Sequence, residues 1–246
     1  AVVATLLFTI FRDTPEKKTA RLLASDKSSE IISKYGQTGS TTLDDGSKVT
    51  IGADSKLRIP PKFNEEVRAI AINGTASVDV AKNDKLPFEL RIANVAVIAT
   101  GTSFAVALDT STKTVFVKVK EGSVDVRAGE KGTPLAAGKS VAIDGSGASR
   151  EPSQAEIDEA FGWMDKRFVV NNRSLRLALD QTRRWYSLAL VPADMSLMDR
   201  KVSVNASLES SKEMIAGLEQ SGNLKFAWDD KTMKLYDAGK PAPKAK

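Results

Sequence analysis

Between residues 30 and 145, apolar side chains alternate with polar ones at a period of two. The pattern is clearest at Val115, Val117 and Val119, and it returns at Val124 and Val126. Because successive side chains of a β-strand point to opposite faces, the alternation predicts half-buried strands. Turn-forming dipeptides such as Asp45-Gly46 and Asn73-Gly74 separate the runs. Many short strands at near-regular spacing predict an all-β domain built as a solenoid, a barrel or a sandwich.

Residues 151–238 have a different pattern, in which two capped helices alternate with strands. Asn172 or Ser174 can cap the first helix, and Ser210 with Glu213 forms a capping box for the second. Alternating runs lie at residues 168–170, 188–190, 201–208, 224–228 and 233–235. The order predicts a small βαββαβ domain, so the chain as a whole is expected to be mainly β plus α+β.

The two ends of the chain differ in character from the domains between them. The first eleven residues are uncharged and almost wholly apolar, about half of the ~20 that a membrane-spanning helix needs. We interpret them as part of a membrane anchor, with a signal-peptide remnant or an apolar strand as alternatives. We expect an anchor remnant and linker at 1–29, the all-β domain at 30–150, the small domain at 151–238 and a basic tail at 239–246. The predicted membrane residues are Leu6, Leu7, Phe8, Ile10 and Phe11.

The composition argues against most kinds of active site. The chain has no cysteine and no histidine, which excludes disulfides, cysteine nucleophiles and Ser-His-Asp triads and argues against zinc. The acidic pairs Asp44-Asp45 and Asp229-Asp230 fall at predicted turns, which explains them without catalysis. We therefore predict a non-enzymatic protein without cofactor or metal. A hydrolase with a carboxylate or Ser-Lys site remains a third hypothesis.

Two segments are candidates for partner binding. Residues 166–186 have five more basic than acidic side chains, an excess equal to the net charge of the chain. They could bind an acidic partner or lipid headgroups, or form a solvated face with Arg176 and Asp180 paired. The strand at 201–208 could accept a partner strand if it lies at a sheet edge, or it could be internal. The candidate residues are Arg176, Arg183, Arg184, Lys201, Ser203 and Asn205. Nucleic acid is not an expected partner, because no reading helix or aromatic platform is evident.

A series of short motifs in residues 42–143 resembles the FecR domain in the order and spacing of that family. It begins with Asp44-Asp45-Gly46-Ser47 and ends with Ala137-Gly138, while Thr75 stands where the family usually has glutamate. Residues 163–237 resemble more loosely the secretin/TonB short N-terminal-like domain that often follows it. The matched positions include Asp45, Gly46, Ser47, Gly74, Pro87, Phe88, Gly101, Thr102, Phe104 and Gly122.

The resemblance implies a solenoid-like or sandwich-like β domain and a small docking domain in the periplasm, anchored to the inner membrane. Such proteins take a signal from an outer-membrane TonB-dependent transducer and relay it to a sigma factor. The cytoplasmic anti-sigma segment of the family is absent from this sequence. Arg12 and other basic residues follow the apolar run, and they argue against a periplasmic location. The alternative is an accessory scaffolding subunit of a large membrane complex, without an anti-sigma role.

Overall fold

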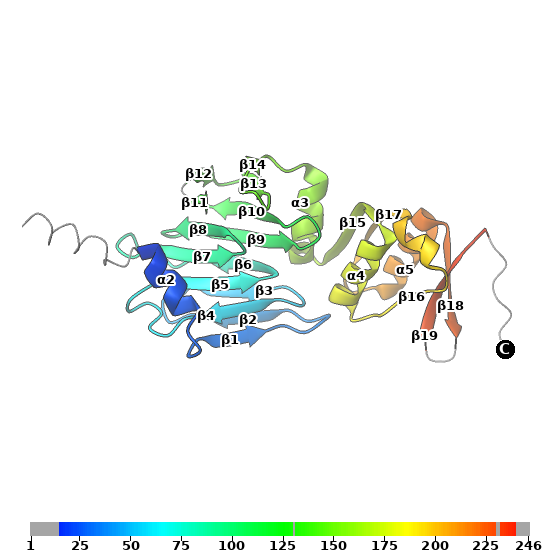
Figure 1. Cartoon of the computed structure of the whole chain (residues 1–246), viewed down its shortest axis with the longest axis horizontal. Coiled ribbons are helices and arrows are strands. Elements are labelled where there is room, and N and C mark those ends of the chain that lie inside the picture. Colours follow the sequence, from blue (N-terminus) through cyan, green and yellow to red (C-terminus); the bar gives the residue numbers. More distant parts are fainter. Residues whose placement is uncertain (1–14, 130, 230–231, 240–246) are drawn as a thin grey trace, which may run out of the picture.

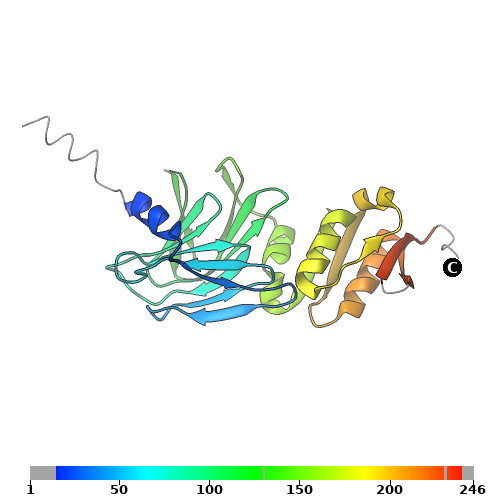
Figure 2. The same cartoon turned by 60° about the horizontal axis from the view of Figure 1, so that its bottom comes forward.

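The computed structural model describes residues 15–129, 131–229 and 232–239. The predicted anchor residues Leu6, Leu7, Phe8, Ile10 and Phe11 lie outside this part of the chain. Helix α2 (Pro15–Leu23) lies at one end of the elongated molecule and the small domain lies at the other, in both views (Figures 1 and 2). Within the described residues, every helix is too short or too polar to cross a bilayer.

Fourteen strands between residues 29 and 150 form two open, seven-stranded sheets. The chain crosses from one sheet to the other after every one or two strands. The first sheet has the order β1 (Ser29–Ile32), β4 (Lys56–Ile59), β5 (Ala69–Asn73), β7 (Phe88–Ile92), β8 (Val95–Ala99), β11 (Ser123–Ala128), β12 (Lys131–Ala136). The second has the order β14 (Ser149–Arg150), β13 (Ser140–Ile143), β10 (Thr114–Glu121), β9 (Ser103–Asp109), β6 (Thr75–Asp79), β3 (Lys48–Ile51), β2 (Gly39–Thr42).

The inward-facing residues of both sheets meet in one hydrophobic core, as the alternation predicted. Val115, Val117 and Val119 of β10 are fully buried there, together with Phe88 and Phe104. Neighbouring pairs are antiparallel except for β5 and β7, which run parallel. The arrangement is a two-sheet sandwich in which one core holds both layers together, and it does not confirm a solenoid.

Several of the motif positions occupy tight corners of this sandwich. Gly46, Gly74 and Gly122 have φ angles of +86°, +116° and +80°, a region that side chains rarely adopt. A Cβ atom on Gly74 would lie 2.3 Å from the Ser55 hydroxyl oxygen. The Thr102 hydroxyl donates to the carbonyl of Ser123, 2.8 Å away. The conformation of the turns thus explains the three glycines, and a hydrogen bond between neighbouring segments explains Thr102.

A buried ion pair joins the two sheets at one end of the sandwich. The Arg68 side chain has no exposed surface, and its Nε lies 2.5 Å from Oδ2 of Asp45, which is 3% exposed. Arg68 also donates to the carbonyls of Ala81 and Leu86. Asp45 accepts hydrogen bonds from the backbone N–H and the hydroxyl of Ser47, at 2.8 and 2.7 Å. Asp45 thus connects the β2–β3 turn with the segment that enters β5.

Two helices cover the outer faces of the sandwich. Helix α2 packs against β5 of the first sheet. Helix α3 (Gln154–Phe161) places Ile157 and Phe161 on an outer patch of the second sheet, formed by Ala105, Ala107 and Phe116 with Ala142. The sequence assigned residues 151–161 to the small domain, and that boundary stays a prediction. In the structure, the apolar face of α3 is buried against the sandwich.

The small domain has the order βαββαββ, one strand more than the βαββαβ order that the sequence predicted. Two helices and two short sheets enclose a second hydrophobic core. One sheet pairs β15 with β17 and the other has the order β16-β19-β18. The predicted strand at 188–190 is instead the two-residue strand β16. The elements are β15 (Arg167–Ser174), α4 (Leu175–Tyr186), β16 (Val191–Pro192), β17 (Lys201–Ser207), α5 (Ser211–Gly222), β18 (Leu224–Asp229) and β19 (Thr232–Asp237), with 3-10 turns at Gly162–Asp165 and Met195–Asp199.

Replacing Arg68 with methionine should strongly destabilise the β domain. The substitution leaves the Asp45 carboxylate buried without its cation, which costs about 3–5 kcal/mol in comparable sites. Chemical unfolding followed by circular dichroism measures the loss. The matched control is Arg127→Met, which removes an exposed pair with Asp125 and should cost at most about 1 kcal/mol. Equal effects of the two substitutions would show that the buried pair has no special role.

Candidate functional site at the domain junction

The three arginines predicted on α4 have different environments. Arg176 is exposed, and no ion pair within 4 Å joins it to Asp180 in the part of the chain described here, unlike the pairing that the sequence allowed. Arg183 is also exposed, and its guanidinium lies 5.0 Å from the centre of the Tyr35 ring. Arg176 and Arg183 therefore remain candidates for partner binding.

Arg184 faces the β domain instead of solvent. Its Nε donates to the carbonyl of Ala53 at 2.8 Å, and its Nη2 lies 3.3 Å from the hydroxyl of Ser55. Burial lowers the pKa of the Arg184 guanidinium, while Asp54 and Tyr35 act in the opposite direction. The Arg184 carbonyl also accepts a hydrogen bond from the Gly36 N–H, at 2.8 Å. Arg184 is thus a contact between the two domains.

The other predicted partner residues lie on strand β17, at a sheet edge. Lys201, Ser203 and Asn205 are exposed, and β17 pairs only with β15 among the described strands. Helix α5 partly shields the free edge, because Ser221 and Glu213 accept hydrogen bonds from the backbone N–H groups of Ser203 and Ser207. A partner strand would therefore have to displace these side chains.

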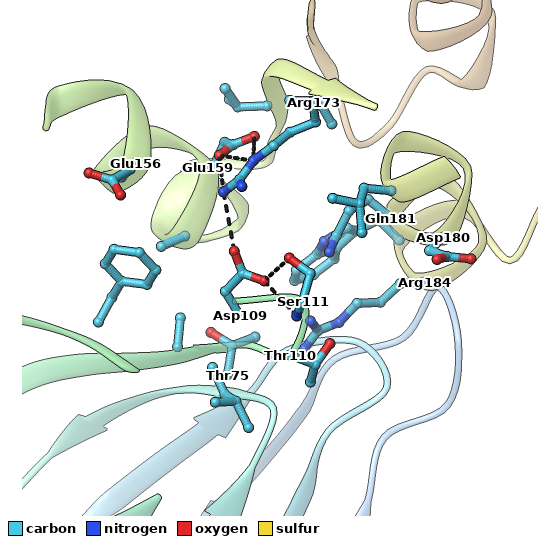
Figure 3. Close-up of a pocket in the computed structure, with 18 residues that line it drawn as sticks. Thr75, Asp109, Thr110, Ser111, Glu156, Glu159, Arg173, Asp180, Gln181 and Arg184 are labelled. Atoms are coloured by element: carbon cyan, nitrogen blue, oxygen red, sulfur yellow. Dashed lines mark hydrogen bonds and ion pairs between the residues drawn. The ribbon is translucent and has the colours of Figure 1, made fainter. Parts of the chain in front are cut away.

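A cavity of about 130 Å³ lies at the junction of the two domains. Its walls come from the β9–β10 turn, α3, β15 and α4, as Figure 3 shows. Arg173 of β15 crosses one side, with Nη2 at 3.2 Å from Asp109 and 3.0 Å from Glu159. The hydrogen bond that Arg173 donates to the Glu159 carboxylate is the main cause of the raised pKa of Arg173. Arg184 and Trp185 line the opposite side.

Two tryptophans complete the junction. The rings of Trp163 and Trp185 are stacked, with centroids 5.9 Å apart and planes 22° apart. Gly52 provides the necessary space, because a Cβ atom there would lie 2.9 Å from the Trp185 ring and 2.5 Å from Thr75. The indole N–H of Trp163 is buried and has no hydrogen-bond partner.

The polar side chains around the cavity are already engaged with one another. Asp109 accepts hydrogen bonds from the backbone and hydroxyl of Ser111 as well as binding Arg173, and Glu159 also accepts from the Asn171 N–H. Within the described residues, no group of three acidic side chains is placed to hold a metal ion. The arrangement joins the two domains through ion pairs and hydrogen bonds.

The sequence did not identify Asp109, Glu159 or Arg173 as a group. They are separated by up to 64 positions, and each alone resembles an ordinary surface charge. The basic excess at 166–186 was evident from the sequence, but nothing local indicated that Arg173 lies against Asp109 and Glu159. Only the folded chain brings the three side chains together.

Comparison with known proteins identifies the β domain. Residues 29–125 match the family model described as "FecR protein". Residues 29–125 are thus similar to the FecR domain. No curated protein matches the chain significantly. The likeness that the motifs around Asp45-Gly46-Ser47 indicated is therefore confirmed, while the secretin/TonB-like assignment of residues 163–237 stays a prediction.

Solved structures share the fold of the FecR domain and of most of the chain. Two crystal structures of a "putative anti-sigma factor" from Parabacteroides distasonis ATCC 8503, at 2.50 and 1.65 Å resolution, align with TM-scores of 0.70 and 0.69. Each is 20% identical, and the alignments cover 85% of this chain and 99% of the other. At this identity the likeness establishes the common fold.

Glu156, at the start of α3, should make the stability of the chain depend on pH. Hydrogen bonds from Arg150, then from the backbone and hydroxyl of Ser153, lower its pKa to about 2. Because an unfolded glutamate titrates near ~4.3, ionised Glu156 stabilises the folded state above that pH. The contribution is lost as the pH falls through about 2. Glu156→Gln should therefore cost about 1 kcal/mol at pH 7 and almost nothing near pH 2.

Urea unfolding of the wild type and the variant at several pH values measures this difference. Glu121→Gln removes an exposed carboxylate on the same chain and serves as the control. A cost of Glu156→Gln that does not change with pH would contradict a role for the ionised carboxylate.

Proposed function

We propose that this chain is a non-enzymatic FecR-type protein that relays a signal to a sigma factor by protein–protein contact. The observation that carries the proposal is the match of residues 29–125 to the FecR model. It is supported by the fold shared with the two crystal structures described as those of a "putative anti-sigma factor". Nothing in these comparisons favours the alternative of a scaffolding subunit.

The arrangement of the domains suits a relay. Helix α2 and the small domain lie at opposite ends of the sandwich (Figure 1). The sandwich acts as a rigid spacer, because one continuous core unites its two sheets. The small domain acts as the docking module and offers Arg176, Arg183 and Lys201 as exposed basic residues. Its partner is an acidic surface, such as that of an outer-membrane transducer.

We further infer that both domains lie in the periplasm, tethered to the inner membrane by residues 1–11. The apolar character of that segment supports the inference, whereas the basic residues that follow it argue for the opposite orientation. An alkaline phosphatase fusion after residue 246 tests it in cells, since the enzyme is active only outside the cytoplasm. An inactive fusion would contradict the proposed location.

Deleting the gene in its own host should change transcription of genes controlled by one alternative sigma factor. Transcript sequencing of the deletion strain and its complemented parent measures the change. Unaltered transcription would contradict the relay itself. The wild-type gene supplied in trans should restore the parental profile.

Reversing the exposed charges should weaken docking without unfolding the chain. Arg176→Glu, Arg183→Glu and Lys201→Glu together remove three exposed contacts, each worth about 0.5–1 kcal/mol. The combined variant should bind its partner about ten- to a hundredfold more weakly, and it should fail to restore the transcription profile. Lys120→Glu, on the sandwich, is the matched control. A triple variant that behaves as the wild type would place the docking surface elsewhere and leave the relay intact.

A further inference from the structure

The two domains have separate hydrophobic cores. The core of the sandwich and the core of the small domain share no residue, and the apolar face of α3 belongs to the sandwich. Each domain therefore keeps its main stabilising contacts if the other moves away. Interfaces between domains permit relative motion unless they are large and hydrophobic.

Polar contacts join the domains on two sides of the junction cavity, and the stacked rings of Trp163 and Trp185 pack against Gly52 beside them. On one side, Arg173 binds Asp109 of the sandwich and Glu159 of α3. On the other side, Arg184 binds the carbonyl of Ala53 and the hydroxyl of Ser55. The cavity between them means that the junction is not close-packed, and the buried indole N–H of Trp163 lacks a partner. Both features lower the free energy that holds the domains together.

The acceptor site for Arg184 is built by the sandwich alone. The Ser33 hydroxyl donates to the carbonyl of Gly52 at 2.5 Å, and the Ser55 N–H donates to the Ser33 hydroxyl at 2.9 Å. The Thr75 N–H donates to the Ser55 hydroxyl at 3.0 Å. These bonds hold residues 52–55 in place whether or not Arg184 is present. The small domain can thus leave and return to the same preformed site.

Arg184 is held at the junction by hydrogen bonds whose favourable energy is partly cancelled by the loss of hydration of its guanidinium. Its guanidinium is partly buried, and its direct hydrogen-bond partners are a neutral carbonyl and a neutral hydroxyl, while Asp54 acts on it only through its charge. A partly buried cation without a direct carboxylate partner loses hydration that its neutral partners replace only in part. Solvent would rehydrate the guanidinium when the junction opens.

We propose that Arg173 and Arg184 form a releasable latch that holds the small domain against the FecR domain, and that the junction opens with both domains folded. The short segment Gly162–Asp165 between α3 and β15 is the hinge, since it is the direct chain connection between the two bodies. Opening separates Trp185 from Gly52 and exposes the cavity. The inference uses no partner and is independent of the proposed function.

Distance measurement between two spin labels on the full chain tests the latch. The chain has no cysteine, so Lys120→Cys on the sandwich and Gln220→Cys on α5 provide two unique labelling sites, both exposed. Double electron–electron resonance then reports the separation of the domains. Arg173→Gln and Arg184→Gln should each raise the ratio of released to docked molecules about tenfold, equivalent to about 1.4 kcal/mol. Their combination should shift the distribution to longer, broader distances, whereas Arg176→Gln on the same helix should not.

Far-UV circular dichroism and hydrogen exchange of the same samples show whether both domains stay folded. Retained spectra and protection in the double variant, together with the longer distances, support the latch. An unchanged distance distribution in the double variant overturns it. Loss of the small-domain protection would also overturn it, because the two arginines would then stabilise a single folding unit.

Discussion

The ion pair between Arg68 and Asp45 is the constraint on which the FecR domain depends. Removing two charges from water is costly, and only close pairing with further hydrogen bonds offsets the cost. Here Asp45 belongs to the turn between two strands of one sheet, whereas Arg68 leads into β5 of the other sheet. The Ser47 hydroxyl donates a further hydrogen bond to the Asp45 carboxylate, and the Ala81 carbonyl accepts one from the Arg68 guanidinium. The Asp-Gly-Ser motif therefore fixes how the two sheets meet, and its conformation cannot change independently of the core.

Ser55 links the hydrogen bonding of the sandwich to the domain junction. It receives the Thr75 N–H inside the FecR domain and also contacts Arg184 of the small domain. Ser55 therefore takes part both in the hydrogen bonding within the sandwich and in the contact with the small domain. Gly74 is required beside it, since any side chain there would collide with the Ser55 hydroxyl. The small domain therefore docks on acceptor groups that bonds within the sandwich already hold in place.

Local sequence signals predicted the elements well because they depend on local physics. Alternation identified the strands that contain Val117 and Val204, and Ser174 and Ser210 cap their helices as expected. The partners of the strands were not predictable, since a period of two indicates which face is buried but not which strand lies alongside. The parallel pairing of β5 with β7 and the alternation between sheets depend on the packing of the whole domain.

The basic excess at residues 166–186 shows where the same reasoning fails. The sequence allowed either a partner-binding face or a solvated face, whereas in the structure the basic side chains of this segment have different environments. Lys166 pairs with Glu209, Arg173 bridges to the FecR domain, and Arg184 is desolvated at the junction. Charge counts along a sequence cannot distinguish these positions, because an arginine stem can cover apolar surface while its guanidinium binds a distant backbone.

The two hydrophobic cores and the polar junction between them differ in the kind of contact that holds them together. The two cores bury aliphatic side chains continuously, whereas the junction depends on guanidinium groups around a cavity. Local opening in proteins takes place where few apolar contacts must be broken. The proposed relay would require rigid bodies joined by a connection that can open. In the proposed latch, Arg173 and Arg184 form that connection, and neither residue belongs to a hydrophobic core.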